Sequence, residues 1–410
     1  MRILMCNSFF YLRGGADRCF LDLSNLLTTQ GHEVIPFCMQ HERNYPSIYS
    51  DYFVSFIDFP SLLNTKTSIQ TKYNVARRVI YNQEAKSNIS QLIKDTNPDI
   101  AHIHGFGHEL SPSILDAIKQ FNIPIVSTLH DYGLLCPNTS FISKGEVCEK
   151  CKIHRYYNVV LHKCKRNSFS ASLLAGIEKS YHSATRIIQK NVDVFISPSV
   201  FLKQKMLEYN NSIETIHIPN FVDVEQIRPS YSTGDYFLFF GRLTAIKGLN
   251  TLVEAMKSIT FAKLRIAGDG ELRESLEDYI KEYRLDNIEI LGHLETTKLV
   301  NLIQDSSFVV VPSEWYENYP MAIIEAFSCG KPVIASRIGA IPDIVQDGYN
   351  GLLFEPRNVR QLIDKIQFMH DNPQITKEMG MNARKQVEKI NNSQTHYLQT
   401  MNVYKSLIHK

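Results

Sequence analysis

The 410-residue sequence lacks any long hydrophobic run: nowhere do the about 18 consecutive apolar residues of a membrane-spanning helix occur. Residues 1–7 form only a short apolar run, which looks like a first strand and lacks the long apolar stretch of a signal peptide. We therefore expect a cytoplasmic protein whose eight cysteines are mostly reduced.

An excess of charge and two common motifs are missing as well. The 44 Lys and Arg nearly balance the 42 Asp and Glu, so the charge gives no sign of nucleic-acid binding. No Gly-x-Gly-x-x-Gly fingerprint of dinucleotide binding is present, which weakens an oxidoreductase interpretation. No Asp-x-Asp pair is present to hold a metal ion, and no repeat or low-complexity tract appears.

Strand-like and helix-like segments alternate along the whole chain, which is typical of parallel sheets with crossover helices. The length suits two domains, and a stretch rich in Pro, Ser and Gly between Pro219 and Tyr236 is the best boundary. We predict an α/β fold of two facing Rossmann-like domains with a central cleft: residues 1–222, joined by a C-terminal helix over 391–410, and residues 223–390. The predicted strands are 2–6, 34–37, 100–104, 123–129, 194–197, 236–240, 263–267, 288–291, 308–311 and 332–335.

Polar and glycine residues follow two predicted strands of the second half. Strand 236–240 ends in Gly241 and Arg242, and Lys247 follows on a loop that opens a helix. Such cations suit a diphosphate, because Arg makes a forked contact and Lys acts as a point charge; ordinary loop cations are the alternative. The next strand ends in Gly268, Asp269 and Gly270, where glycines let a ligand approach the backbone closely.

The most informative segment is 311–330. Pro320 begins a short predicted helix, whose N-terminus offers N–H groups and a positive dipole to a phosphate. Glu317 precedes this helix and Glu325 lies inside it, so their carboxylates can accept hydrogen bonds from sugar hydroxyls at two separate points. The alternative is a buried helix with one solvated and one salt-bridged glutamate.

Taken together, these motifs resemble those of the retaining glycosyltransferases of GT-B architecture, specifically glycosyltransferase family 4 (group 1). The Gly-Arg-Leu…Lys-Gly element lies at 241–248, the glycine-rich strand end at 268–270, and the Glu-x7-Glu element runs from Glu317 to Glu325. The resemblance covers nearly the whole chain. It implies transfer of a hexose-type sugar, with retention, from a nucleotide-diphosphate sugar to a hydroxyl of a glycan or lipid-linked acceptor in surface polysaccharide biosynthesis. It also implies that catalysis needs no metal or other cofactor.

The resemblance assigns roles to the donor-side residues. Arg242 and Lys247 would neutralise the diphosphate, Glu317 would hold hydroxyls of the transferred sugar, and Glu325 would hold the ribose. Main-chain N–H groups around Asn318, Tyr319, Pro320 and Met321 would help bind the phosphates and sugar. The sequence departs from the family where Gly339-Ala340 replaces a glycine pair and Asp343 stands where Glu is usual, which puts the base pocket in doubt.

The first half carries two further candidates. Gly14 and Gly15 lie between the first strand and first helix and resemble the family's glycine loop, which reaches the donor phosphate; a plain tight turn is the alternative. His130 follows strand 123–129, at a position where the family's histidine contacts the donor sugar. His102 and His104 are interpreted as histidines with structural partners inside a strand.

Four cysteines follow His130 at Cys136, Cys148, Cys151 and Cys164. They have the residue types of a structural zinc site, with free thiols as the alternative. The surrounding segment is basic and would face a phosphate-bearing acceptor or a membrane surface; a merely solvated loop is the alternative. Segment 64–94 is a second candidate for peripheral membrane contact, as a basic amphipathic helix; a plain surface helix is the alternative. The basic residues of the first segment are Lys150, Lys152, His154, Arg155, His162, Lys163, Lys165 and Arg166.

Two other function classes remain open at this point. A sugar phosphorylase or epimerase shares the fold, but would release or rearrange sugar without a separate acceptor. A non-catalytic GT-B binding protein is the third interpretation. The presence of His130, Arg242, Lys247, Glu317 and Glu325 argues against it, because a decayed site should have lost at least one of them.

Overall fold

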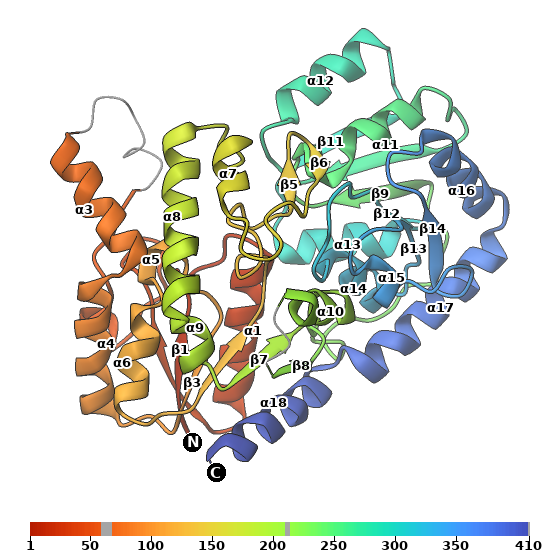
Figure 1. Ribbon diagram of the computed structural model, residues 1–410. Helices are drawn as coiled ribbons and strands as arrows, with labels where there is room; N and C mark the ends of the chain where they lie inside the picture. The colour runs from red at the N-terminus through yellow and green to blue at the C-terminus, as the bar shows by residue number, and fades with distance from the viewer. Residues whose placement is uncertain (59–67, 210–213, 409–410) are drawn as a thin grey trace. The chain divides into compact units, whose positions relative to one another are not determined.

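The computed structural model describes residues 1–58, 68–209 and 214–408, and the chain divides into two compact units (Figure 1). The division falls after Ile218, near the predicted boundary at 222, and the C-terminal helix α18 (Ser393–Ile408) is shared, with residues from Tyr397 onward belonging to unit 1. Unit 1 comprises Met1–Lys144, Cys148–Ile218 and Tyr397–Lys410; unit 2 comprises Gly145–Val147 and Pro219–His396.

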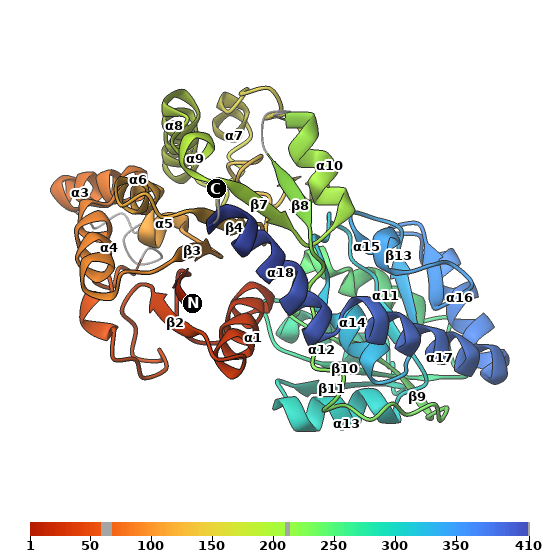
Figure 2. The same cartoon turned by 90° about the horizontal axis from the view of Figure 1, so that it is seen from below.

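Unit 1 is built on a six-stranded parallel sheet with the strand order β2-β1-β3-β4-β7-β8. Its central strands are buried on both sides, because helices cover both faces: α4 and α6 lie on one side and α1 on the other (Figure 2). The strands are β1 (Arg2–Cys6), β2 (Glu33–Phe37), β3 (Ile100–Ile103), β4 (Ile125–Thr128), β7 (Val194–Ser197) and β8 (Thr215–His217).

The helices of unit 1 begin and end where the sequence supplies caps. Helix α1 stops before Gly31, which has a left-handed φ of 81°, and Ser168 caps α8 by accepting a hydrogen bond from the N–H of Ala171. A small hairpin pairs β5 (Ile142–Ser143) with β6 (Glu146–Val147), whose residues are counted with unit 2. The helices are α1 (Gly15–Thr29), α3 (Ile69–Ile80), α4 (Gln83–Thr96), α5 (Gly107–Leu110), α6 (Ser113–Gln120), α7 (Tyr157–Leu161), α8 (Phe169–Thr185), α9 (Ile187–Asn191) and α10 (Val200–Tyr209).

Unit 2 repeats this architecture with a second six-stranded parallel sheet, in the order β11-β10-β9-β12-β13-β14. Alternate side chains of β9 enter two separate cores. Leu238 packs with α14 and α17 on one face, whereas Phe237 and Phe239 pack with α11 and α16 on the other. The strands are β9 (Tyr236–Phe240), β10 (Lys263–Ala267), β11 (Ile288–Gly292), β12 (Val309–Val311), β13 (Val333–Ser336) and β14 (Gly351–Phe354).

Helices flank the sheet of unit 2 on both faces, as in unit 1. None of the helices in the described ranges of the chain is both long enough and apolar enough to cross a bilayer. The helices are α11 (Leu249–Met256), α12 (Arg273–Glu282), α13 (Thr296–Asp305), α14 (Met321–Ser328), α15 (Ile341–Ile344), α16 (Val359–Asp371) and α17 (Pro373–Ile390).

Candidate active site

The carboxyl ends of β9 and β10 lie side by side in unit 2 and are joined by their backbones. The N–H of Gly241 donates to the carbonyl of Ala267 (3.0 Å), and the N–H of Leu243 donates to the carbonyl of Asp269 (2.9 Å). A Cβ at Gly268 would lie 1.8 Å from the carbonyl oxygen of Gly241, and one at Gly270 would lie 2.5 Å from that of Leu243. The loop after β9 therefore requires glycine at 268 and 270, independently of any ligand.

The charged side chains at these strand ends differ in their partners. Asp269 accepts a hydrogen bond from the N–H of Gly270 (2.8 Å) and forms an exposed ion pair with Arg273 (3.6 Å). Arg242 is exposed, and within the described part of the chain its guanidinium has no hydrogen bond or ion pair. Arg242 is consequently available to an external anion in a way that Arg273 is not.

Lys247 and Glu317, predicted to serve different parts of one ligand, form an ion pair. The Lys247 Nζ lies 2.6 Å from Glu317 Oε1, which also accepts a hydrogen bond from the Ser313 hydroxyl at 2.6 Å. The Glu317 side chain is 5% exposed and that of Lys247 22%. Burial raises the pKa of Glu317, but the charge of Lys247 and the hydrogen bonds to the carboxylate outweigh it and lower the pKa overall. A buried carboxylate is thus held ionised beside a cation that remains accessible.

The backbone of Glu317 is fixed by the loop that follows β13. The N–H of Ala340 donates to the Glu317 carbonyl (2.9 Å). Gly339 has a left-handed φ of 57°, and a Cβ there would lie 2.6 Å from the Glu317 nitrogen. The Gly339-Ala340 departure from the family pattern therefore keeps the glycine that this close approach needs, and Ala340 contributes its backbone N–H while its methyl group is buried.

Helix α14 follows directly, with Pro320 as its N-cap residue. Glu325 lies on this helix and is partly buried, while Asn318 is buried just before it. The Tyr319 hydroxyl accepts a hydrogen bond from Asn391 Nδ2 (2.6 Å), and burial raises the pKa of this hydroxyl. The segment before α14 is thereby anchored at two points, the Glu317 carbonyl and the Tyr319 hydroxyl.

In unit 1, His130 is hydrogen-bonded to a second histidine. His104 Nδ1 lies 2.9 Å from His130 Nε2, and the two rings stack with centroids 5.1 Å apart. Burial lowers the pKa of His130 to about 4, against a raising influence from Asp17. The His130 imidazole is therefore neutral at physiological pH.

His102 has the structural role that the sequence predicted. Its two ring nitrogens lie 2.6 Å from the Tyr404 hydroxyl and 2.7 Å from the Thr128 hydroxyl. His104 was interpreted in the same way, but it contacts the candidate site residue. Sequence reasoning missed this role because the contact depends on β3 and β4 being neighbours in the sheet. It missed Ser313 too, although a hydroxyl four residues before Glu317 was a signal that could have been used.

The glycine loop before α1 is open. A Cβ on Gly14 would meet nothing within 4 Å, and its φ of −173° is ordinary extended backbone. Gly15 begins α1, in whose first turn the buried Asp17 accepts hydrogen bonds from Asn7 Nδ2 (3.0 Å) and Arg13 Nε (3.2 Å). The surrounding side chains thus hold the loop without using the space above Gly14.

The four cysteines after His130 lie in one neighbourhood of unit 1. All are free thiols, and burial raises the pKa of Cys136 and, to about 12, that of Cys151, with a further rise from the neighbouring thiols. Across residues 1–58, 68–209 and 214–408, however, no three His, Cys, Asp or Glu side chains converge so as to hold a metal ion. Zinc binding by Cys136, Cys148, Cys151 and Cys164 therefore stays a prediction without support from the side-chain geometry.

Two Rossmann-like units with charged groups at the strand ends define the GT-B class of glycosyltransferases. The model of "Glycosyltransferase Family 4" matches residues 13–226, and that of "Glycosyl transferases group 1" matches residues 223–386. The chain belongs to this family, and it is a glycosyltransferase. The predicted family and fold class are confirmed.

Individual relatives agree. An uncharacterised glycosyltransferase of Methanocaldococcus jannaschii is 36% identical over 196 residues, which cover 47% of this chain and 54% of that one, so the match spans about half of the relative. An uncharacterised 42.6 kDa protein in the cps region of Klebsiella pneumoniae is 26% identical, over 84% of this chain and 87% of its own. Among solved structures, the Anabaena protein Alr3699/HepE in complex with UDP has a TM-score of 0.68 at 18% identity, over 99% of this chain and 100% of its own, a likeness of fold.

Proposed function

We propose that this glycosyltransferase moves a hexose-type sugar from a nucleotide-diphosphate sugar to a hydroxyl of a glycan or lipid-linked saccharide. One observation carries the proposal: a buried carboxylate, Glu317, is held ionised by Lys247 at the carboxyl edge of a parallel sheet, where such folds bind their ligands. The Anabaena neighbour of the same fold was crystallised with UDP, which supports a nucleotide donor.

The cations serve the leaving group. As the bond from sugar to phosphate breaks, negative charge grows on the nucleotide diphosphate, and preorganised cations stabilise that charge. Arg242 is exposed without a partner in the described part of the chain, so it binds the diphosphate without breaking a contact. Lys247 remains tied to Glu317, which fixes its position before the donor arrives.

The two glutamates hold the two sugars of the donor. Glu317 uses Oε1 for Lys247 and Ser313, and we assign Oε2 to hydroxyls of the transferred sugar. Glu325, eight residues along on α14, holds the ribose hydroxyls. Positive charge develops on the transferred sugar at the transition state, so the ionised form of Glu317 favours bond breaking.

His130 acts on the transferred sugar as a neutral imidazole. With Nε2 engaged by His104, the remaining ring nitrogen, Nδ1, is the one that bonds a sugar hydroxyl. His104 is then a positioning residue, because it sets the tautomer and orientation of His130 without touching the donor. The open space at Gly14 leaves room for the donor phosphate beside Gly15, which begins α1.

For the stereochemical course we propose retention by front-face attack. No residue of the site is an obvious covalent nucleophile, so the acceptor hydroxyl attacks directly and the leaving phosphate takes its proton. We further propose, from the family resemblance, a cytoplasmic enzyme of surface polysaccharide biosynthesis that needs no metal in catalysis.

A screen of nucleotide-diphosphate sugars tests the proposal. The donor should raise the melting temperature, because a ligand selective for the native state stabilises it, and it should be slowly hydrolysed without an acceptor. Product analysis with glycan acceptors distinguishes transfer from the phosphorylase and epimerase alternatives. If no nucleotide-diphosphate sugar shifts the melting temperature or is consumed, the proposed donor class is wrong.

A further inference from the structure

Helix α8 in unit 1 exposes a stripe of large apolar side chains. Phe169, Leu173, Ile177 and Tyr181 recur every four residues and are 57%, 41%, 49% and 40% exposed. Four-residue spacing places these side chains on one side of the helix, the pattern with which a helix normally packs onto a core. Here the small residues of α8 face the core instead, so the apolar stripe faces outward.

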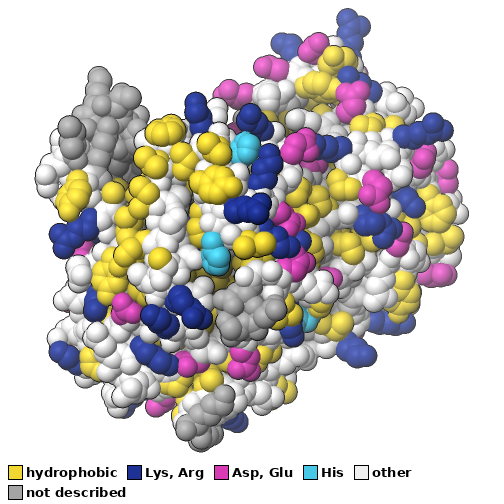
Figure 3. Space-filling view, viewed as in Figure 1, with side chains coloured by type: hydrophobic (Ala, Val, Ile, Leu, Met, Phe, Trp, Pro, Cys, Tyr) yellow, Lys and Arg dark blue, Asp and Glu magenta, His cyan; other side chains and the backbone are white. Residues whose placement is uncertain are grey.

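Helix α7 extends this apolar surface. Tyr157 and Leu161 are 61% and 70% exposed, and Ile153 just before the helix is 69% exposed. The two helices pack closely at Gly176, where a Cβ would lie 3.3 Å from side-chain atoms of Val159 and Val160. Hydrophobic side chains accordingly gather over α7 and α8 (Figure 3). We call this surface, formed by Ile153, Tyr157, Leu161, Phe169, Leu173, Ile177 and Tyr181, the α7–α8 face.

The segment that carries the α7–α8 face is rich in cations, although Lys152 is paired with Glu208 (2.8 Å) and Lys179 donates a hydrogen bond to the Gly133 carbonyl (2.7 Å). Residues 150–190 contain nine Lys or Arg and one acidic residue, Glu178. In the whole chain, by contrast, the 44 Lys and Arg nearly balance the 42 Asp and Glu. Glu178 lies 3.3 Å from His108 in an ion pair and is mostly withdrawn from solvent. Arg155, Lys163 and Arg166 are exposed, and among the residues described in the structure none has an ion-pair partner.

We propose that the α7–α8 face docks on an anionic phospholipid bilayer. An apolar face flanked by cations is what an interfacial helix needs, because its apolar side chains enter the acyl boundary while Lys and Arg meet the phosphates. The excess of cations in residues 150–190 also opposes pairing of this face with its own copy, since two such faces would repel each other. If the proposed function holds, the docked enzyme meets lipid-linked acceptors at the membrane surface.

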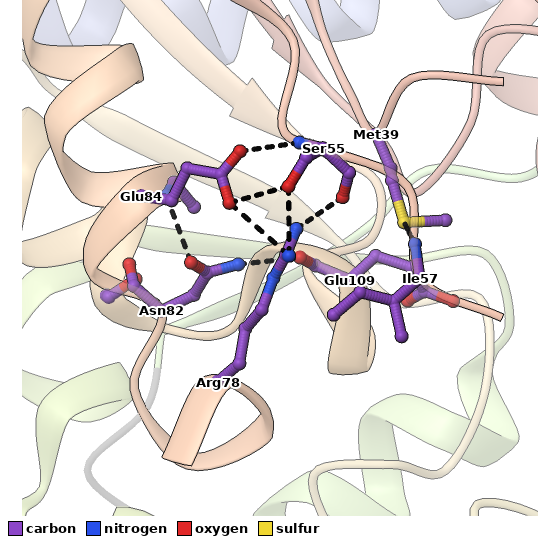
Figure 4. Close-up of polar contacts among 9 residues, drawn as sticks. Met39, Ser55, Ile57, Arg78, Asn82, Glu84 and Glu109 are labelled. Carbon is purple, nitrogen blue, oxygen red and sulfur yellow. Dashed lines mark hydrogen bonds and ion pairs between the residues drawn. The ribbon is translucent and has the colours of Figure 1, made fainter. Parts of the chain in front are cut away.

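The segment that the sequence singled out at 64–94 is a weaker docking candidate. Its start, 64–67, lies outside the described residues, and α3 follows. Figure 4 shows Arg78 of α3 directed inward: it forms an ion pair with Glu84 (3.3 Å) and donates hydrogen bonds to Ser55. Lys86 is likewise engaged, with the Tyr81 hydroxyl (3.0 Å). These cations hold the domain together rather than facing a membrane.

Vesicle binding by the whole chain tests the docking surface. The wild type should sediment with vesicles of phosphatidylglycerol and phosphatidylcholine, should remain in solution with phosphatidylcholine alone, and should be released by high salt. The double variant Leu173→Ser, Ile177→Ser should lose most of this binding. Neutralising two charges with Arg155→Gln and Lys163→Gln should weaken it on the order of thirtyfold.

Matched controls keep the result specific. Phe368→Ser with Leu398→Ser alters two comparably exposed apolar residues on α16 and α18, and should bind vesicles as the wild type does. Thermal melts confirm that every variant is folded. Glu317→Gln should bind vesicles normally, so a failure of the proposed chemistry remains distinguishable from a failure of docking.

Two outcomes would overturn the proposal. The first is a wild type that ignores anionic vesicles, or α7–α8 variants that bind as well as the wild type. The second is a wild type that is dimeric in solution by sedimentation velocity and becomes monomeric with Leu173→Ser and Ile177→Ser, since that result assigns the face to a second copy of the chain.

Discussion

The glycine loops of the two units look alike in the sequence and differ in the structure. Gly14 and Gly268 each follow a parallel strand and precede a helix. A Cβ on Gly14 would meet nothing within 4 Å, whereas one on Gly268 would lie 1.8 Å from a backbone oxygen. The difference teaches that a glycine after a strand can serve a ligand or a neighbouring loop, and that only the packing around it distinguishes the two.

Alanine substitutions at these two glycines test the comparison most severely. Gly268→Ala should destabilise the protein by at least about 3 kcal/mol, because its Cβ overlaps backbone that cannot move aside. Gly14→Ala should change stability by less than about 0.5 kcal/mol, since the position is open. Urea unfolding measures the first effect, and nucleotide titration of the stable Gly14→Ala variant should show weakened donor binding. Equal stability losses at both positions would show that the two loops do not differ as described.

The two donor-side cations allow a second comparison, between Arg242, which has no side-chain partner among the described residues, and the paired Lys247. Arg242→Ala should abolish most of the melting-temperature rise caused by UDP and leave the unliganded protein unchanged. Lys247→Ala should also reduce that rise, but should destabilise the unliganded protein by roughly 1–3 kcal/mol, because it leaves the buried Glu317 carboxylate with the Ser313 hydroxyl but without its cation. Scanning calorimetry with and without UDP checks both. An undiminished UDP effect in the double variant would place the diphosphate elsewhere.

A smaller effect is expected at His104, which positions His130. His104→Leu should lower kcat about threefold to tenfold with little change in KM, because it removes one hydrogen bond that orients His130. His104→Asn should recover much of the rate, because its amide can take the place of the His104 Nδ1 atom. A purely structural role predicts instead that both variants lose activity in proportion to their loss of stability.

The smallest effect concerns the cysteines. If Cys136, Cys148, Cys151 and Cys164 hold zinc, native mass spectrometry should find about one zinc per chain, lost in the variant with Cys148→Ser and Cys151→Ser. Protein purified without chelators that contains no zinc would assign these residues as reduced thiols.

Much of the fold was predictable because its strands are apolar runs between glycine or proline signals. Strands β1, β9 and β10 have the predicted bounds. Two strands were not predicted: β8, which has only three residues, and β14, whose four-residue run carries no alternating pattern. The apolar spacing of α8 also could not show whether its stripe is buried or exposed, because core-facing and membrane-facing helices have the same spacing of apolar residues.

The site was predictable only in part, because the sequence does not show which site residues contact one another. Motifs at strand ends pointed to Arg242, Lys247 and Glu317, since local sequence marks a loop that opens a helix. The pairing of Lys247 with Glu317 joins residues 70 positions apart, and the contact of His104 with His130 follows from the order of strands in the sheet. Local patterns contain neither relation.

The most direct test of the central claim compares turnover and nucleotide affinity in Glu317→Gln and Glu325→Gln. Glu317 would touch the sugar as its bond breaks, so Glu317→Gln should lower kcat about tenfold to a hundredfold while UDP affinity changes little, as expected for the loss of a charge-assisted hydrogen bond. Glu325→Gln should instead weaken donor and UDP alike, because ribose is unchanged by the reaction. Normal turnover by Glu317→Gln, with a purely chemical defect in Glu325→Gln, would contradict the assignment of the two carboxylates.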